Sequence, residues 1–438
     1  MHIAIIGAGI AGVTAAHALA AQGHRVTVFE RRGSVAAEAS FAHLGLIAPS
    51  GAGPGSFDAT PPLAERGRWG LHPQAHLRPG WDAAAWRWLW QARQAAAPRR
   101  ATAQKSLGEL ARYGRLQLLK LVAAHRLEYE RADGHLVLLC SAKQLDEARQ
   151  GLVDLKARGV EARLLDAAAC RALEPGLQGG TALAGGLHFP QDEVGNCRQF
   201  AHLLKEAGER AGVEFRFCTE VTGITSGPSP ALRSIELAET TAFLQSRQEL
   251  AADSGNSGME EHFDAVMLCA GAQAAPLLRQ LGLRLPLLPI YGYTITATLR
   301  DYDRGPRSAV TDAQAGIGIA RLGHRVRVSG GIEIGTAPHQ HHEALLRPLY
   351  EALDRWFPGA AHTHRNHAQA WKGASPTLPD GLPVLGASVV PGIWLNLGHG
   401  TQGWALACGA ARLLADRISG RSPDLALGPF EPARLQER

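Results

Sequence analysis

The chain has 438 residues, of which 45% are hydrophobic and 19% charged. This composition is typical of a folded globular protein, and the length favours two closely packed domains. The net charge of +5 is spread along the chain without a Lys/Arg run, which argues against nucleic-acid binding. Six cysteines without a CxxC pair, and no apolar run long enough for a membrane span, predict neither a disulfide or zinc framework nor a transmembrane helix.

The first thirty residues are predicted to form a strand, a glycine turn, a helix and a second strand. Residues 2–6 are an apolar, β-branched run typical of a buried parallel strand. They are followed by a GxGxxG turn at residues 7–12, an alanine-rich helix over residues 11–21, and a second strand over residues 25–29 that ends at Glu30.

Each part of this unit has a physical task in binding a dinucleotide. Gly7 permits the tight turn, Gly9 lets the main chain approach a pyrophosphate, and Gly12 lets the helix pack close to the strand. The helix N-terminus attracts the phosphates, and Glu30 can accept hydrogen bonds from a ribose diol. By itself the motif predicts a nucleotide cofactor without separating FAD from NAD.

Four further segments decide between these cofactors. They are residues 38–49, 185–195 and 289–296, and a C-terminal segment in which Trp371-Lys372-Gly373 and Pro379-Asp380-Gly381 precede the glycine-dense residues 398–403. In these segments, and in order along essentially its whole length, the chain resembles the D-amino-acid dehydrogenase branch of the D-amino-acid oxidase-like flavoproteins. The resemblance implies an α/β fold with an FAD-binding Rossmann-like domain and a discontinuous α+β substrate domain that has a mainly antiparallel sheet.

The resemblance also implies where the domains divide. We expect the FAD-binding domain to contain residues 1–83, 190–286 and 370–438, and the substrate domain residues 84–189 and 287–369. Within them we predict a helix over residues 101–125 with one leucine face, strands over residues 265–269 and 325–329, and a helix over residues 404–418. Trp86 and Trp90 share a helix face and are expected to pack between the domains. The polar residues 226–261 predict a hairpin with a long mobile tip.

The cofactor implied by the resemblance is noncovalent FAD. The N-terminus of the helix after residues 398–403 would stabilise the negative charge of the reduced flavin. No metal is expected, because the two histidine clusters (His339, His341, His342 and His362, His364, His367) lie in polar stretches. The positions expected to contact FAD are Gly7, Gly9, Ile10, Ala11, Gly12, Glu30, Arg31, Ser40, His43, Leu44, Gly45, Ile47, Val221, Ala270, Gly271, Gly398, His399, Gly400, Thr401, Gln402 and Gly403.

The reaction implied by the resemblance is oxidation of an amino acid at its carbon–nitrogen bond. Hydride leaves Cα for flavin N5, and water converts the imine to a 2-oxo acid and ammonia. The protein contributes orientation and charge placement, for which Tyr291, Tyr293, Arg321 and His399 are the candidates. In the family an Arg holds the substrate carboxylate, because its planar fork makes two hydrogen bonds. This chain has Ser375 at that position.

Ser375 leaves two kinds of substrate open. Either another cation holds the carboxylate of a D-amino acid, or the substrate is a different amine, an imino acid or an N-substituted amino acid. A flavin-binding protein without catalytic activity is the alternative from another class. The electron acceptor would be a quinone or oxygen, and the resemblance implies a cytoplasmic enzyme, with peripheral contact to the inner membrane face as a further alternative.

Overall fold

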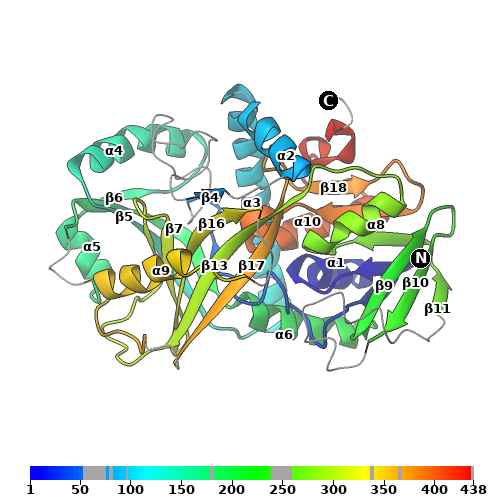
Figure 1. The fold of residues 1–438 in the computed structure, drawn as a ribbon, viewed down its shortest axis with the longest axis horizontal. Helices are drawn as coiled ribbons and strands as arrows, with labels where there is room; N and C mark the ends of the chain where they lie inside the picture. Colours follow the sequence, from blue (N-terminus) through cyan, green and yellow to red (C-terminus); the bar gives the residue numbers. More distant parts are fainter. Residues whose placement is uncertain are drawn as a thin grey trace.

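The structure is a computed structural model that describes residues 1–52, 75–77, 82–94, 97–177, 182–237, 259–335, 340–363 and 367–435. A largely parallel sheet, a long mixed sheet and a small antiparallel sheet organise the chain (Figure 1). The helices of the described residues are α1 (Ile10–Ala20), α2 (Ala83–Gln94), α3 (Ala97–His125), α4 (Ala142–Ala157), α5 (Ala167–Leu173), α6 (Cys197–Arg210), α8 (Ala274–Gln280), α9 (Glu343–Trp356) and α10 (Gly403–Ile418).

The largely parallel sheet has the strand order β18-β19-β12-β1-β2-β8. Strand β1 lies between β2 and β12 and is parallel to both. The carboxyl ends of these strands meet at one edge of the sheet, which is where open α/β sheets bind their ligands. The strands are β1 (His2–Ile6), β2 (Arg25–Phe29), β8 (Glu214–Arg216), β12 (Ala265–Leu268), β18 (Val384–Ala387) and β19 (Ile393–Leu397).

The long sheet follows the order β17-β13-β16-β15-β14-β5-β7-β3, with β4 beside β16 and β6 beside β7. Helix α9 covers one face of this sheet, where Leu349 and Trp356 pack with Tyr293 and Ile295. Its strands are β3 (Leu46–Ile47), β4 (Ala75–Leu77), β5 (Arg131–Leu139), β6 (Arg163–Asp166), β7 (Gly185–Gly195), β13 (Leu288–Thr298), β14 (Ala309–Asp312), β15 (Ile317–Leu322), β16 (Arg325–Ile334) and β17 (Ala368–Thr377).

The small sheet has the order β11-β10-β9. Its strands are β9 (Thr219–Thr225), β10 (Ala231–Glu236) and β11 (Met259–His262), and both pairs are antiparallel. The predicted mobile tip falls on residues 238–258, which lie outside the described residues.

Helices α3 and α10 cross at two glycines. A Cβ on Gly409 would lie 2.9 Å from Gly114 Cα, and a Cβ on Gly114 would lie 2.3 Å from the Ala405 carbonyl oxygen. Glycine at both positions therefore lets the two backbones approach. Leu110 and Leu118 are buried in the same core, and Leu107 and Leu121 pack against it. The predicted leucine face of this helix is therefore confirmed.

The arrangement confirms the predicted α/β class and most of the local elements. The strands predicted at 2–6 and 25–29 are β1 and β2, and α10 begins one residue before its predicted start. The strand predicted over 325–329 extends to Ile334 and pairs antiparallel with β13 and β15. The predicted domain boundaries stay a prediction, although the boundary at 370 would divide β17, and both β3 and β4 pair with the long sheet.

The prediction for the tryptophans of α2 is wrong. Trp86 and Trp90 are 45% and 57% exposed. Trp88 is the buried one, and its Nε1–H donates to the Thr377 carbonyl oxygen at 2.9 Å. The helix packs through nearly the opposite face from the one that the spacing suggested, because the apolar stripe of α2 includes Ala85, Trp88 and Leu89.

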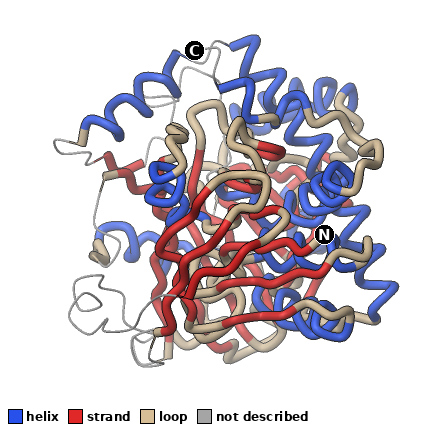
Figure 2. The backbone as a smooth tube through the Cα atoms, turned by 90° about the vertical axis from the view of Figure 1, so that its right-hand side faces the viewer, coloured by secondary structure: helices blue, strands red, loops and turns tan. Residues whose placement is uncertain are grey.

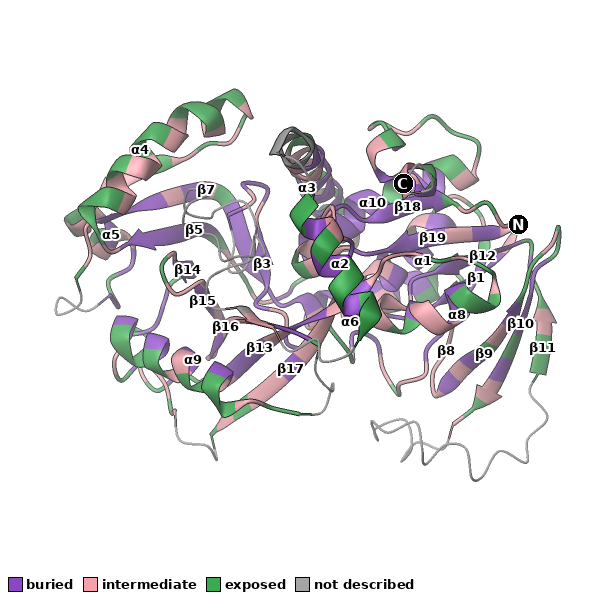
Figure 3. Cartoon of the chain, turned by 45° about the horizontal axis from the view of Figure 1, so that its top comes forward, coloured by how far each residue is buried: buried purple, intermediate pink, exposed green. Residues whose placement is uncertain are grey.

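Burial follows the layered arrangement. Figure 2 shows the strands crossing the middle of the molecule with helices at its periphery. In Figure 3 the strands of the parallel sheet are largely buried, whereas α4 lies at the surface and presents many exposed residues. Among the described residues, no helix combines the length and apolar character needed to cross a lipid bilayer.

Candidate functional site

The glycine turn between β1 and α1 is closed on one side and open on the other. A Cβ on Gly7 would lie 2.7 Å from the Cys269 carbonyl oxygen, and a Cβ on Gly12 would lie 1.9 Å from the Gly7 carbonyl oxygen. Among the described residues, a Cβ on Gly9 would meet Ser40 Oγ at 3.6 Å and nothing closer. The turn therefore leaves room beside Gly9 for a group that approaches the main chain at the positive end of α1.

Glu30 lies at the end of β2, next to this turn. Its carboxylate accepts hydrogen bonds from the main-chain N–H groups of Ala8 at 2.7 Å and Arg32 at 2.8 Å. Burial raises the pKa of Glu30, and these hydrogen bonds act in the opposite direction. The carboxylate is thus held at the turn with lone pairs left for a diol. Val221 of β9 lies near this strand end, where the Thr219 N–H donates to the Glu30 carbonyl oxygen.

The first prediction separates the two glycine roles. Gly9 has φ −66° and ψ 179°, which suit any residue, so Gly9→Ala should leave the apoprotein folded while its methyl group occupies the open space. We expect FAD affinity to fall about 10- to 100-fold. Gly12→Ala should instead lower the melting temperature of the apoprotein, because its Cβ meets backbone. FAD titration by fluorescence and thermal melting measure the two effects; equal melting temperatures for the two variants would contradict this division.

The loop from Ser40 to Ile47 connects this turn to α10. Ser40 Oγ accepts a hydrogen bond from the Ile10 N–H at 3.2 Å. His43 Nδ1 accepts from the Gly45 N–H at 3.0 Å, so its Nε2 carries the proton and donates to the Thr401 carbonyl oxygen at 3.1 Å. Burial lowers the pKa of His43, which agrees with this neutral form. The remaining residues, Leu46 and Ile47, pair with β7.

The glycine-dense loop before α10 lies at the same edge of the parallel sheet. Gly398 and Gly400 have φ of +78° and +57°, a conformation that favours glycine. No side chain among the described residues caps the N-terminus of α10, and its first turn has no acid. Ala270 and Gly271, the latter at φ +54°, follow β12 at this edge. Two helix N-termini therefore open on the side where an anionic cofactor would lie.

His399 is half-buried in this loop, and its buried Nε2 is unused by the part of the chain that the structure describes. Its Nε2 has no hydrogen-bond partner among the described residues. Burial lowers the pKa of His399 to about 4. The imidazole is therefore neutral near pH 7 and offers a polar atom to whatever occupies the edge of the sheet.

This lowered pKa predicts a pH dependence of stability. The unfolded chain takes up a proton on His399 at a higher pH than the folded chain, so folded stability falls as the pH decreases from about 6.5 to 4. His399→Asn should reduce that loss by up to about 3 kcal/mol. The measurement is the free energy of unfolding across this pH range, with exposed His324→Asn as the control. An unchanged slope in His399→Asn would contradict the assignment.

Ser375 lies beside the α10 loop, on the face of β17 that is turned away from α9. The neighbouring Thr377 forms a bridge with His399, and a Cβ on Gly400 would lie 3.3 Å from Thr377 Oγ1. Gly373 lies on the same face as Ser375, and Gly292 is its partner in β13. A Cβ on Gly292 would meet the Gly331 carbonyl oxygen at 3.8 Å and no closer atom of the described residues, so this part of the sheet has a bare surface. We name Ser375, Gly373 and Gly292 the substrate patch.

The other residues expected to orient the substrate are not brought to this patch. Tyr293 is fully buried on the α9 side of the sheet, where its hydroxyl donates to Glu333 at 2.7 Å. Tyr291 is on that same side, with Lys372 Nζ 4.6 Å from its ring centroid. Arg321 lies toward the far end of β15, where its Nε–H donates to the Gly323 carbonyl oxygen and its guanidinium covers the Tyr302 ring. Only Ser375 and His399 of these candidates lie together.

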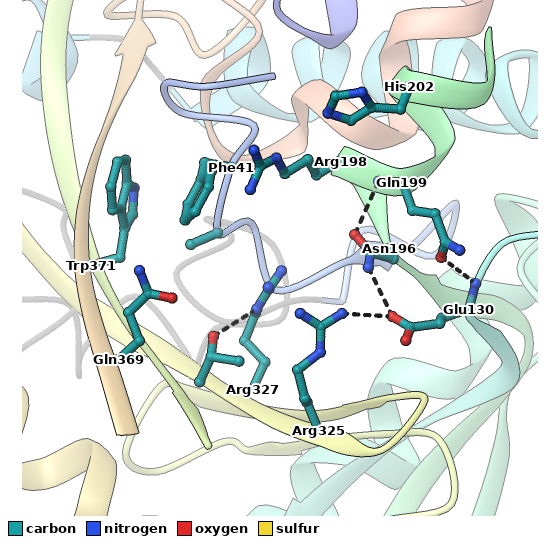
Figure 4. Close-up of a pocket in the computed structure, with 12 residues that line it drawn as sticks. Phe41, Glu130, Asn196, Arg198, Gln199, His202, Arg325, Arg327, Gln369 and Trp371 are labelled. Atoms are coloured by element: carbon teal, nitrogen blue, oxygen red, sulfur yellow. Dashed lines mark hydrogen bonds and ion pairs between the residues drawn. The ribbon is translucent and has the colours of Figure 1, made fainter. Parts of the chain in front are cut away.

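A cavity of about 390 Å³ lies on the same sheet face as the substrate patch, toward the other end of the strands (Figure 4). Among the described residues that line it are three arginines, Arg198 of α6 and Arg325 and Arg327 of β16. The sequence prediction missed this cluster. The alternation of Arg325 and Arg327 indicated a shared strand face, but nothing local connected them with α6. None of the positions expected to contact FAD lines the cavity.

Comparison with known proteins places this geometry in a class. The sequence profile of the family described as FAD dependent oxidoreductase matches residues 2–417. The D-amino acid dehydrogenase of Cereibacter sphaeroides is 38% identical over 97% of this chain and 93% of its own length. Glycine oxidase from Geobacillus kaustophilus has a TM-score of 0.70 at 21% identity, with 98% of this chain and 97% of that chain covered. Iminodiacetate oxidase from Chelativorans sp. BNC1 also has a TM-score of 0.70, at 20% identity over 98% of both chains.

The fold and the glycine-lined edge thus define an FAD-dependent oxidoreductase. The chain belongs to the D-amino-acid oxidase-like (DAO) family of these enzymes. Its own residues fit the cofactor: Gly9 leaves space at the start of α1, Glu30 is held in place at the neighbouring strand end, and His399 Nε2 is a buried polar atom without a partner among the described residues. The two solved structures share the fold, and at these identities they show the fold alone.

Proposed function

We propose that the protein oxidises the carbon–nitrogen bond of a D-amino acid. One observation carries this proposal: the similarity to D-amino acid dehydrogenases extends over the whole length of the chain. It therefore includes the glycine turn before α1, the glycine loop before α10 and the substrate patch. FAD, held noncovalently, supplies the hydride acceptor, and water then converts the product imine to a 2-oxo acid and ammonia. A quinone or oxygen takes up the electrons, and use of a quinone would bring the enzyme to a membrane surface.

The contribution of the chain is to hold the amino acid over the sheet. Gly292 leaves room on the sheet face, Gly373 lets the Trp371 ring lie against the strand, and Ser375 can offer its hydroxyl to a carboxylate. Beside the patch, strands β13 and β16 are joined by side-chain hydrogen bonds as well as by their pairing: Thr294 Oγ1 donates to Ser329 Oγ at 3.0 Å, and Ser329 Oγ donates to the Tyr293 carbonyl oxygen at 3.2 Å.

The direct test is anaerobic reduction of the bound flavin. Purified holoenzyme should lose its visible flavin absorbance with one or more D-amino acids and retain it with the matching L-amino acids. Imino acids and simple amines without a carboxylate form the other arms of the panel. Reduction of the flavin by amines without a carboxylate, together with no reduction by any D-amino acid, would contradict the proposal.

Ser375 favours a second candidate, an N-substituted amino acid or an imino acid. A single hydroxyl provides at most one neutral hydrogen bond in place of a two-point ion pair, so the carboxylate contributes less to binding here than an arginine would provide. A substrate that gains more of its binding energy from a group on nitrogen would suit such a patch. Reduction of the flavin by N-substituted amino acids, with D-amino acids inert, would select this candidate.

The role of the carboxylate at this position can be tested by adding the missing charge. Ser375→Arg places a guanidinium on the open face beside Gly373, and we expect kcat/KM for D-amino acids to rise about 10- to 100-fold. Ser375→Met has similar length without the charge and serves as the matched control. Steady-state rates with an artificial electron acceptor provide the measurement. A fall in kcat/KM for Ser375→Arg that equals the fall for Ser375→Met would show that the carboxylate does not bind here.

A further inference from the structure

The arginine-lined cavity carries more positive charge than its described residues neutralise. Three guanidinium groups line it, and Glu130 is the acid among the described lining residues, so two positive charges remain. Glu130 Oε2 is 3.0 Å from Arg325 Nη2 and also accepts from Asn196 Nδ2 at 2.8 Å, and its charge is thus used on one side of the cavity (Figure 4). Arg198 and Arg327 have no ion pair with an acid among the described residues.

Each of the other two arginines is held in place by neutral groups. Arg327 is 5% exposed, and it donates from Nε to Thr296 Oγ1 at 3.1 Å and from Nη1 to the His43 carbonyl oxygen at 2.7 Å. Arg198 Cζ lies 4.4 Å from the centroid of the Phe41 ring, and its buried Nε has no hydrogen-bond partner among the described residues. Both guanidinium groups are therefore oriented while their charges stay uncompensated.

The surroundings make this charge costly in the absence of an anion. Burial, and then the charge of Arg325, lowers the pKa of Arg198, and the same two causes lower the pKa of Arg327 to about 10. The N-terminus of α6 adds the positive end of a helix dipole, and its first turn contains no acid. Phe41 packs against Trp371 in a tilted arrangement, with 4.6 Å between ring centroids, and the two rings close the side opposite Glu130 (Figure 4). A preformed, partly buried cationic cavity of this kind is complementary to an oxyanion.

We propose that this cavity binds a small oxyanion, a carboxylate or a phosphate, at a site separate from the substrate patch. Arg198 and Arg327 provide donors for the oxyanion, and the volume of about 390 Å³ lies within the range of small-molecule sites. The site shares a wall with the loop from Ser40 to Ile47. In this loop the His43 carbonyl oxygen accepts a hydrogen bond from Arg327 Nη1, and the His43 imidazole donates to the Thr401 carbonyl oxygen. The inference does not depend on which amine the enzyme oxidises.

The strand register separates the two sites. Ser375 pairs with Ile290 of β13, whereas Arg327 pairs with Thr296, six residues further along the same strand. At the usual rise of a β-strand these levels are about 20 Å apart, which is beyond the reach of one arginine side chain. A carboxylate bound to Ser375 therefore does not reach Arg327, and Trp371 lies on the same sheet face between these two levels.

The test is calorimetric titration of the holoenzyme in dilute, phosphate-free buffer. Separate titrations with inorganic phosphate, succinate and pyruvate distinguish the phosphate and carboxylate sources. We expect one anion per chain for at least one probe, and a binding constant that weakens about tenfold or more in Arg198→Gln. Arg210→Gln removes the same charge from the exposed end of α6 and should change binding less than about twofold. No binding of any probe at about 10 mM, or equal losses in Arg198→Gln and Arg210→Gln, would overturn the proposal.

Two further variants keep the outcome decisive if Arg198→Gln does not fold. Gln369 lines the cavity, and Gln369→Glu would supply the missing negative charge from the protein itself. This variant should melt at a higher temperature than the wild type in anion-free buffer and should no longer bind the anion. Ser375→Met alters the substrate patch and should leave anion binding unchanged. Loss of anion binding in Ser375→Met, with retention in Gln369→Glu, would assign the anion to the substrate patch and refute a separate site.

Discussion

The contact between Gly12 and the Gly7 carbonyl oxygen sets the geometry of the flavin half of the molecule. With 1.9 Å between that oxygen and a Cβ on Gly12, α1 can follow β1 at this distance only with glycine. Helix α10 lies against α1, where Thr14 Oγ1 donates to the Ala407 carbonyl oxygen at 3.3 Å. Both helices start at the carboxyl ends of parallel strands, so the close approach of α1 brings two helix N-termini without an acid in the first turn to one edge of the sheet.

The parts of the structure that depend on local chemistry could be predicted from the sequence. The GxGxxG turn, its two strands and the start of α10 each rest on residues within a few positions of one another. The substrate half was harder, because the direction of its side chains depends on register. Tyr291 and Tyr293 both face α9, and beside them the pairing of β13 with β16 shifts by one residue between Gly292 and Tyr293, which no local pattern indicates. The arginine cavity is lined by residues of α6, β13, β16, β17 and the loop from Ser40 to Ile47, and no local sequence pattern connects such distant segments.

Strand β17 shows how a charged residue close to the site in sequence is kept from it in space. Lys372 Nζ lies 2.8 Å from Glu333 Oε2, and both side chains are fully buried. Glu333 also accepts from the Tyr293 hydroxyl, and Lys372 donates to the Gln340 carbonyl oxygen at 2.9 Å. Breaking a buried pair of this kind costs several kcal/mol, about 3–5 in measured cases, so Lys372 does not turn to the opposite face. It cannot supply the cation that Ser375 lacks.

The fold alone does not specify the substrate, since solved structures with the same fold carry the names glycine oxidase and iminodiacetate oxidase. In this chain the charged and uncharged parts of one sheet face are separated along the strands. The substrate patch consists of glycines and a serine, whereas the guanidinium groups gather at the level of Thr296. The start of α10 adjoins the substrate patch through the bridge between Thr377 and His399, so an amine held there lies next to the glycine loop that opens α10. Among the described residues, the arginine cavity is connected to that loop only through His43, whose carbonyl oxygen accepts from Arg327 and whose imidazole contacts Thr401.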